Sequence, residues 1–349
     1  MPKAATLYKT IRIAEIRQEA KDFKTFVFEA THGITYKSGQ FLTLVQMQDR
    51  EEIRRSYSIT SSPVLNEPLT IGVKRIPNGI FSRQLLDNAK IGDEWQTIGS
   101  GGFFVLPDNI GDYRQVFFFA AGSGITPIFS LLKTALHAHP HLSVVLIYSN
   151  SSTDKAIFLE PIRELHQQFG DRFQLELLFS NNRNLYRARL HRDLLLEYLH
   201  KLSFSDASKV LFYICGPESY MRLCTYTLQA EGISPNNIRK ENFILHKALS
   251  RTALPPDAAT HHALIRINGT EQEVTVHYPD SVLKAAKKAG LQLPYSCEVG
   301  RCGNCVARCT RGAVWHAYNE VLTEKELQQG LILTCVAHPV GGDITLEIK

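Results

Sequence analysis

The sequence lacks any long apolar run and any export signal. No stretch reaches the roughly 18 consecutive apolar residues that a membrane helix needs. The basic residues between Met1 and Thr10 are not followed by the apolar segment of a signal peptide. We therefore expect no membrane association and a cytoplasmic location. In that compartment the seven cysteines would be ligands or thiols rather than disulfides.

Clustered charge of one sign is lacking as well. The formal net charge is +5, but the chain has no run of about five or six like charges and no basic stretch interleaved with aromatic residues. Residues 261–349 carry nine basic and nine acidic residues, so the excess lies in the first 260 residues. This pattern predicts no nucleic-acid partner.

Short alternating runs fill residues 1–110. Examples are Phe26–Phe28, Phe41–Val45 and Leu69–Val73, and turn residues such as Pro77-Asn78-Gly79 lie between them. Closely spaced strands without long helices predict an antiparallel β-barrel domain over residues 1–110.

Strands and helices alternate over residues 111–246. Gln115–Ala121 is a continuous apolar run, which is typical of a strand buried on both faces. Further strands are predicted at Val144–Tyr148, Phe173–Phe179 and Val210–Ile214, with helical patterns between them. Strict alternation predicts a doubly wound α/β domain with a parallel sheet.

Residues 247–260 contain Pro255-Pro256 and no apolar period, so we interpret them as a linker. A third domain is predicted over residues 261–349. It begins with a hairpin of Leu264–Ile267 and Val274–Val276, continues with a short helix at Val282–Ala289, and then has a cysteine-rich loop.

Four cysteines of the third domain have the spacing of plant-type [2Fe–2S] ligands. Four residues separate Cys297 from Cys302, two separate Cys302 from Cys305, and 29 separate Cys305 from Cys335. Gly300 and the pair Gly303-Asn304 would let the loop turn its N–H groups toward the sulfur atoms. Thr323–Glu326 resembles a capping box for a short helix before Cys335.

Structural zinc is the alternative for this quartet. Zinc sites with four cysteines usually consist of two short C-x-x-C-type pairs, whereas here three cysteines share one loop. The spacing therefore favours the iron–sulfur cluster. Cys224 and Cys309 are interpreted as small buried apolar residues instead of ligands.

Two motifs in the first domain have the chemistry to bind a phosphorylated aromatic cofactor. Arg55-Ser56-Tyr57-Ser58 offers a guanidinium for a phosphate, an aromatic face for a ring and a hydroxyl for a ring nitrogen. Gly79-Ile80-Phe81-Ser82 offers a glycine and backbone amides at the start of a helix, where a pyrophosphate binds. Taken alone, the first motif is weak, because such residues more often belong to an ordinary exposed strand.

Two further motifs follow strands of the second domain. Gly122-Ser123-Gly124-Ile125-Thr126-Pro127 would allow a tight turn and close approach of a dinucleotide, although proline stands where a third glycine is common. Cys215-Gly216-Pro217 would reach the same crevice, or could be a simple turn with Cys215 in the core.

The order and spacing of these four motifs resemble the ferredoxin-NADP⁺ reductase superfamily from about Thr10 to Phe243. With the cysteine-rich domain added, the whole chain resembles three-domain reductases such as those of phenylacetyl-CoA epoxidase and of ring-hydroxylating monooxygenases. Ser38 replaces the proline of the family's P-G-Q-F motif, and Ala188 replaces a glycine common before Arg189. The resemblance implies that the third domain is a β-grasp ferredoxin.

The resemblance also implies the cofactor sites. FAD would bind at Arg55, Tyr57, Ser58, Val73, Lys74, Gly79, Phe81 and Ser82, with Thr126 beside the flavin ring and Phe243 covering a flavin face. NADH or NADPH would bind at Gly122, Ser123, Gly124, Thr126, Pro127, Ser149, Asn150, Cys215, Gly216 and Pro217. Ser58 and Cys215 are the expected catalytic residues, because hydride would pass to the flavin beside them.

The implied function is transfer of electrons from NAD(P)H through FAD and the cluster to an oxygenase component. A di-iron monooxygenase of the phenylacetyl-CoA epoxidase type, acting in phenylacetate degradation and hence aromatic compound catabolism, is the expected partner. Another di-iron or Rieske oxygenase, a stand-alone diaphorase and a cluster-based redox sensor are the alternatives. The coenzyme preference stays open, because Asn181-Asn182 precede Arg183, and Arg187 and Arg189 lie close by.

Overall fold

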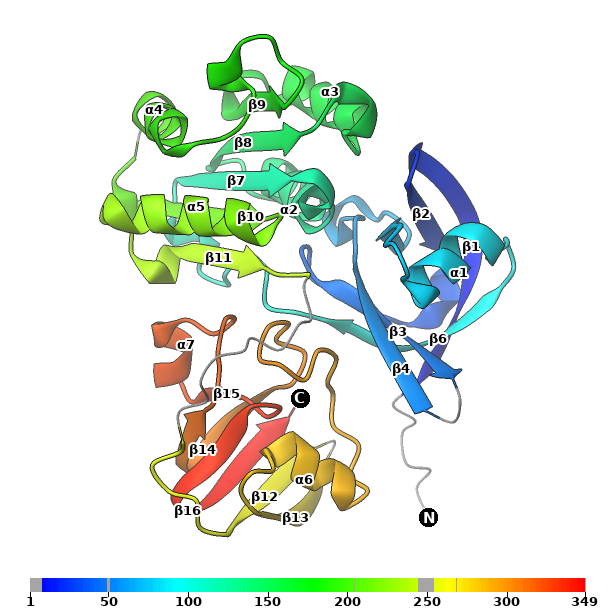
Figure 1. Cartoon of the computed structure of the whole chain (residues 1–349), viewed down its shortest axis with the longest axis vertical. Helices are drawn as coiled ribbons and strands as arrows, with labels where there is room; N and C mark the ends of the chain where they lie inside the picture. The colour runs from blue at the N-terminus through cyan, green and yellow to red at the C-terminus, as the bar shows by residue number, and fades with distance from the viewer. Residues whose placement is uncertain (1–7, 49–50, 204, 244–253, 268, 349) are drawn as a thin grey trace. The chain divides into compact units, whose positions relative to one another are not determined.

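The structure is a computed structural model that describes residues 8–48, 51–203, 205–243, 254–267 and 269–348 (Figure 1). The chain divides into two compact units, Met1–Glu241 and Asn242–Lys349. Residues 247–253 of the predicted linker lie outside the described ranges. Within those ranges, no helix combines the length and the apolar character needed to cross a membrane.

The first unit begins with a six-stranded antiparallel barrel. Its strands lie in the order β4-β3-β6-β1-β2-β5. A bridge between Ile59 and Ile71, and a 2.8 Å hydrogen bond from Thr60 N to Thr70 O, join β4 to β5 and close the barrel. The bounds are β1 Lys9–Ala20, β2 Phe23–Phe28, β3 Phe41–Gln48, β4 Glu51–Ser58, β5 Thr70–Lys74 and β6 Glu94–Gly101.

Alternate strand residues fill the barrel interior, as the period of two predicts. Ile11, Phe26, Leu42 and Ile71 are among the buried members of this core. Helix α1 (Ile80–Asn88) adds buried side chains to the same core. The predicted β-barrel is therefore confirmed.

The first unit continues with a five-stranded parallel sheet in the order β11-β10-β7-β8-β9. The strands are β7 Gln115–Ala121, β8 Ser143–Asn150, β9 Phe173–Phe179, β10 Val210–Cys215 and β11 Ile238–Glu241. From β7 the chain builds outward through β8 and β9, then returns to place β10 on the other side of β7. The strand order thus reverses between β7 and β10, where ligands of doubly wound sheets bind.

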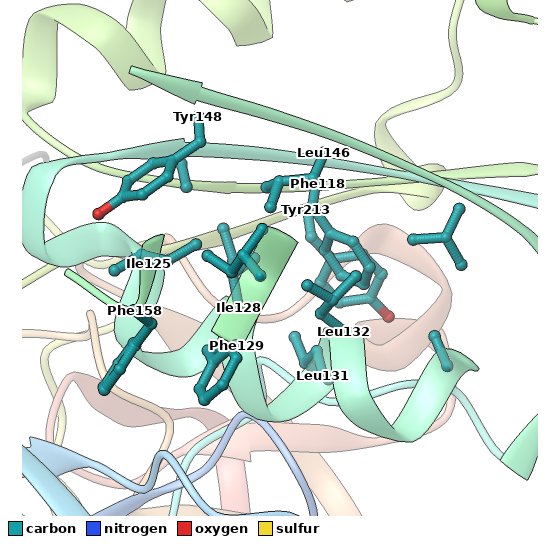
Figure 2. Close-up of a cluster of buried hydrophobic side chains, with 14 of the residues drawn as sticks. Phe118, Ile125, Ile128, Phe129, Leu131, Leu132, Leu146, Tyr148, Phe158 and Tyr213 are labelled. Atoms are coloured by element: carbon teal, nitrogen blue, oxygen red, sulfur yellow. The ribbon is translucent and has the colours of Figure 1, made fainter. Parts of the chain in front are cut away.

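Helices cover both faces of this sheet. Helices α2 (Ile125–Ala138) and α3 (Leu159–Phe169) pack on one face, and α4 (Arg192–Leu202) and α5 (Glu218–Ala230) pack on the other. Figure 2 shows Phe118, Leu146 and Tyr213 of the sheet facing the side chains of α2. The continuous apolar run of β7 arises because its even-numbered residues face α2 and its odd-numbered residues face α4 and α5.

Helix α2 also packs on the barrel. Ser130 Oγ donates a 2.5 Å hydrogen bond to the Ser61 carbonyl oxygen, and the Ser62 and Thr134 hydroxyls are 2.7 Å apart. Phe23 from β2 packs edge-on against Phe158, with ring centroids 5.9 Å apart. These contacts make the barrel and the parallel sheet one compact unit.

The second unit has a five-stranded sheet in the order β13-β12-β16-β14-β15. Strand β12 pairs with β16 in parallel, and the other neighbouring pairs of this sheet are antiparallel. This mixed sheet and its short helices give the predicted ferredoxin fold. The bounds are β12 His261–Ile267, β13 Thr270–Val276, α6 Val282–Lys288, β14 Val306–His316, α7 Glu324–Gln328, β15 Leu331–Leu333 and β16 Ala337–Ile348.

Local predictions in the second unit are confirmed except at Cys309. Thr323 and Glu326 form a reciprocal capping box at the start of α7. Cys224, in the first unit, is fully buried as predicted, but Cys309 is partly exposed, so the prediction that it is buried was wrong. The register of β14 shifts between Cys309 and Arg311, and this bulge changes which side chains face the core.

Candidate functional site

The predicted flavin residues of β4 lie at the end of that strand. Arg55 is exposed, Tyr57 is partly buried and Ser58 is buried. Burial raises the pKa of the Tyr57 phenol, so the ring stays neutral and able to stack. The Arg55 guanidinium donates a 2.7 Å hydrogen bond to the Arg54 carbonyl oxygen, and one such bond uses only one of its five N–H groups.

The start of α1 lies beside Tyr57. Gly79 is the N-cap residue and no side chain caps the helix, so the chemistry of its first backbone amides suits a phosphate. Ser82 Oγ accepts a hydrogen bond from Ile76 N at 3.3 Å and donates one to the Gly79 carbonyl oxygen at 3.2 Å. Phe81 is buried, and its ring centroid lies 6.3 Å from that of Tyr57. Phe81 therefore fixes α1 against β4.

Thr126, from the first turn of α2, meets the barrel at Gly72. A Cβ atom built on Gly72 would lie 3.0 Å from Thr126 Cγ2 and 2.5 Å from the Phe23 ring. Only a residue without a side chain allows this approach. Val73 and Lys74 follow Gly72 directly, so the structure brings Thr126 to the strand that carries two predicted flavin residues. Pro127 is buried within the same helical turn.

A cavity of about 740 Å³ opens where the parallel sheet faces the barrel. Its walls come from the carboxyl ends of β7, β8 and β9, from the first turn of α5, and from the β1–β2 turn of the barrel. The predicted residues that line it are Lys74, Gly122, Ser123, Ser149, Asn150 and Pro217. Gly124, Thr126, Pro127, Cys215 and Gly216 are not among its lining residues.

Three polar groups of this cavity are buried and make at most a weak contact with a neighbouring side chain in the described structure. They are Ser149 Oγ, Asn150 Nδ2 and the Tyr220 hydroxyl. A buried polar group without a partner costs free energy, so a polar ligand would stabilise this arrangement. The site therefore fits the ribose, phosphate or amide groups of a pyridine dinucleotide. Sequence reasoning missed Tyr220, because its position on the first turn of α5 carried no recognisable motif.

Cys215 and Gly124 do not line the cavity but pack against each other beside it. Gly124 packs against the backbone of Cys215, while the Cys215 side chain is fully buried in the core. Burial raises the pKa of the Cys215 thiol well above its usual value, and the nearby Glu241 carboxylate acts in the same direction. The thiol is thus neutral and lies in the core, and a catalytic role for Cys215 stays a prediction.

The arginines after β9 differ in their surroundings. Arg187 donates hydrogen bonds to Glu176 at 2.5 Å and to the Tyr198 hydroxyl at 3.1 Å. Arg189 is exposed and lines the cavity beside Ala188 and Ser180. Of these two arginines, Arg189 is therefore the one placed to meet a bound coenzyme.

The cysteine-rich loop is held in a tight conformation by left-handed residues. Glu298, Gly300 and Gly303 have φ values of 56°, 74° and 72°. A Cβ atom on Gly300 would lie 2.8 Å from the Tyr318 carbonyl oxygen, so this glycine is required for packing as well as for its φ. The loop buries Cys302 and Cys305, while Cys297 stays partly exposed.

The four thiols form two pairs. The Cys297 thiol lies beside that of Cys302, and the Cys305 thiol beside that of Cys335. In the described residues, no three His, Cys, Asp or Glu side chains converge as the ligands of one metal ion would. Two pairs of thiols suit the two irons of a [2Fe–2S] cluster, in which four cysteines are shared between the metals, and do not suit one tetrahedral zinc.

Backbone N–H groups surround the first ligand. The neighbouring Cys302 thiol, followed by the amides of Val299, Arg301 and Cys302, lowers the pKa of Cys297 below its usual value. Such donors stabilise negative charge on ligand sulfur. At the fourth ligand, Thr334 N and Oγ1 both donate to the Cys305 carbonyl oxygen at 3.1 Å and hold the segment before Cys335.

Phe243 belongs to the second unit and is exposed. Its neighbour Asn242 donates a 3.3 Å hydrogen bond from Nδ2 to Glu320, whose carboxylate also pairs with Arg301 of the cysteine-rich loop at 3.2 Å. The predicted position of Phe243 over a flavin face stays a prediction.

Comparison with known proteins agrees with these three sites. Residues 10–105 match the family model described as an oxidoreductase FAD-binding domain, residues 118–225 an oxidoreductase NAD-binding domain, and residues 265–340 a 2Fe-2S iron-sulfur cluster binding domain. The ferredoxin reductase component of 3-ketosteroid-9-alpha-monooxygenase from Mycolicibacterium smegmatis is 32% identical, with 96% of this chain and 95% of that protein covered.

Two further likenesses extend over nearly the whole chain. One component of the 1,2-phenylacetyl-CoA epoxidase from Escherichia coli is 29% identical, and the alignment covers 98% of each protein. The solved structure of phthalate dioxygenase reductase has a TM-score of 0.58 at 21% identity, with 98% of each chain covered. This likeness shows the fold.

The fold and the sites define a flavin- and iron–sulfur-dependent pyridine nucleotide oxidoreductase. The chain belongs to the family of three-domain reductases that combine an FAD-binding barrel, an NAD-binding domain and a plant-type [2Fe–2S] domain. Its cofactors are FAD and a [2Fe–2S] cluster, and its electron donor is NADH or NADPH.

Proposed function

We propose that this protein passes electrons from NAD(P)H, through FAD and the [2Fe–2S] cluster, to an oxygenase component. The observation that carries the proposal is the shared wall of the 740 Å³ cavity. Lys74, a predicted flavin residue of β5, and Gly122-Ser123, predicted coenzyme residues after β7, line the same cavity. One chain therefore has a place where a nicotinamide and a flavin can meet, and a separate unit with two cysteine pairs.

Different residues would bind FAD and the nicotinamide coenzyme. Arg55 and the backbone amides of α1 would hold the FAD phosphates, and Tyr57 and Ser58 would contact the flavin ring. Ser149, Asn150 and Tyr220 would hold polar groups of the coenzyme, and Thr126 would lie beside the flavin ring at the β5 contact. Bound FAD supplies the change from a two-electron donor to a one-electron acceptor. The protein's contribution is to place the reacting rings within about 3–3.5 Å of each other.

For the acceptor, we propose a di-iron oxygenase of the phenylacetyl-CoA epoxidase type. The support is the alignment with the 1,2-phenylacetyl-CoA epoxidase component, which covers 98% of both proteins. The ketosteroid monooxygenase reductase matches at 32% identity, so a steroid oxygenase is the partner to compare directly.

Reconstitution tests this proposal. The loaded protein is mixed in turn with a purified phenylacetyl-CoA epoxidase oxygenase and a purified ketosteroid oxygenase, each with its substrate. We expect NAD(P)H oxidation that depends on substrate and yields product with the first oxygenase. Product with the ketosteroid oxygenase alone would assign the other partner, and product with neither would refute both assignments.

A Cys302→Ser variant separates this function from the alternatives. We expect it to keep FAD and to reduce ferricyanide, while losing transfer to the oxygenase, because one cluster ligand is missing. Undiminished cytochrome c reduction with flavin bound would mean that the cluster is not the exit route, which is the behaviour of a diaphorase. A wild-type protein that binds the cluster but does not oxidise NAD(P)H would favour the redox sensor.

A further inference from the structure

Helix α6 contacts both the segment before Cys335 and the loop that carries Cys297. Its first turn is bonded to the segment before the fourth ligand, because Leu283 N donates a 2.9 Å hydrogen bond to the Thr334 carbonyl oxygen. Its last turn carries Lys287, which reaches the loop of the first ligand. The helix itself is anchored by buried Val282, Leu283 and Ala286. It is therefore a fixed support for both segments.

Lys287 contacts the chain on both sides of Cys297. Its Nζ lies 2.8 Å from Glu298 Oε1 and 3.7 Å from the centroid of the Tyr295 ring. The first contact is an ion pair and the second a cation–π contact, and one ammonium group makes both. Glu298 follows Cys297 directly and Tyr295 precedes it by two residues.

The contact with Lys287 helps to hold an unfavourable backbone conformation at Glu298. Glu298 has a φ of 56°, a left-handed conformation that costs energy for a residue with a Cβ atom. Such a conformation persists only where the surroundings hold it, and the Lys287 ion pair supplies a contact that does so. Cys297 is also the ligand that is partly exposed, whereas Cys302, Cys305 and Cys335 are 7%, 3% and 8% exposed.

We propose that Lys287 is a positioning residue of the cluster site: it holds the chain on both sides of Cys297 and balances the charge of Glu298, and so helps to set the cluster's reduction potential. The proposal predicts the direction in which each loss of charge shifts the reduction potential. A reduced cluster carries one more negative charge than an oxidised one. An unbalanced carboxylate beside it therefore lowers the reduction potential, and an unbalanced ammonium raises it.

Two single variants with opposite charge effects test the proposal. Lys287→Met leaves the Glu298 carboxylate unbalanced, and we expect a lower reduction potential in a spectroelectrochemical titration of the loaded full-length protein. Glu298→Gln leaves the ammonium unbalanced, and we expect a higher potential. The double variant should return close to the wild-type value. Both single-variant shifts should shrink at high salt, because the pair is partly exposed.

Lys284→Met is the matched control, because Lys284 lies on the same helix but pairs with Asp280, at 2.8 Å, away from the loop. Asp280 keeps its contact with Lys288 in this variant. We expect its potential to equal that of the wild type. The reduction potential of Lys287→Arg should also stay close to that of the wild type, since a guanidinium can make both the ion pair and the contact with the ring.

Cluster release gives a second readout. In the presence of a chelator, we expect Lys287→Met to lose its visible cluster absorbance about tenfold faster than the wild type, the lower end for residues that support metal ligands. Lys284→Met should lose it at the wild-type rate. Shifts of the same sign in Lys287→Met and Glu298→Gln, or no shift in either, would overturn the proposal. Should Lys287→Met not take up the cluster, a Glu298→Gln potential at or below the wild-type value would refute it.

Discussion

Gly124 and Cys215 are packed backbone against backbone: a Cβ atom built on Gly124 would lie 2.1 Å from the Cys215 carbonyl oxygen. The contact joins the turn after β7 to the end of β10, where the strand order of the sheet reverses. The second glycine of the Gly122–Pro127 motif is therefore explained by packing between two strand ends, and the coenzyme cavity lies on the other side of that contact.

Gly124→Ala should damage both stability and coenzyme binding, because the new methyl group forces the two turns apart. We expect a loss of about 1–3 kcal/mol in the free energy of unfolding, as for overpacked cores, together with weaker NAD(P)H binding. Urea unfolding and coenzyme titration measure the two effects. Gly111→Ala is the control, since a Cβ atom there meets nothing within 4 Å. A Gly124→Ala protein with wild-type unfolding and binding would contradict this explanation.

Tyr220→Phe removes a buried hydroxyl whose neighbour in the described structure is Ser149, with no hydrogen bond of good geometry between them. We expect the dissociation constant for NAD(P)H to rise about fivefold, which corresponds to one hydrogen bond of about 1 kcal/mol. Stability without coenzyme should fall little, because only the weak contact of the hydroxyl with Ser149 is lost. Stopped-flow reduction of the flavin at several coenzyme concentrations gives both affinity and limiting rate.

The control for Tyr220 lies on the same helix. Tyr226 is 62% exposed, so Tyr226→Phe should leave coenzyme affinity unchanged. A Tyr220→Phe variant with wild-type affinity, or with clearly lower stability in the absence of coenzyme, would show that the hydroxyl serves the fold and does not bind the coenzyme.

Asp257 should make the second unit sensitive to acid. Hydrogen bonds from the amides of Ala259 and Gly341, and from His261, lower the pKa of this carboxyl group to about 2. Because the pKa is lower in the folded than in the unfolded protein, the stabilisation is complete above the usual pKa near 4. It is lost as the pH falls from there toward about 2.

Asp257→Asn should remove this contribution at neutral pH. We expect faster hydrogen exchange of the Gly341 amide, which donates a 2.8 Å hydrogen bond to Asp257 Oδ2. The difference from the wild type should disappear as the pH approaches about 2. A difference in stability that stays constant over this range would mean that the carboxyl charge is not the cause.

The four predicted ligand cysteines stand out in the sequence because a cluster needs closely spaced thiolates, and three of the four lie within nine residues of one another. The parallel sheet was equally predictable, since β7 is apolar from Val116 to Ala121 and the strands alternate with helices. Both features depend on residues that are close together in the sequence, so a short stretch of sequence is enough to predict them.

Features that depend on distant contacts could not be predicted. Lys287 resembles its neighbours Lys284 and Lys288 in sequence, and only the fold brings it to Tyr295 and Glu298. The burial of the Tyr220 hydroxyl likewise depends on β8 and β10 ending at one cavity. Cys309 was misjudged because the bulge in β14 changes the alternation of side chains within the strand.

A shortened linker should slow delivery of electrons while leaving their uptake intact. The bonds of Asp257 to His261 and to the Gly341 amide tie the end of the predicted linker to the second unit, so the deletion should be confined to residues 247–253. We expect flavin reduction by NAD(P)H at the wild-type rate, because the coenzyme cavity is built from the first unit alone. Electron transfer to the oxygenase should become slower, because a shorter tether restricts where the cluster domain can reach.

A replacement of residues 247–253 by glycine and serine at equal length is the control for this deletion. It keeps the reach of the tether while changing its sequence, so we expect wild-type transfer. If the deletion transfers electrons as fast as the wild type, the cluster domain does not need to move between collecting and delivering them. If the glycine–serine replacement is as slow as the deletion, the sequence of this segment matters and its length does not.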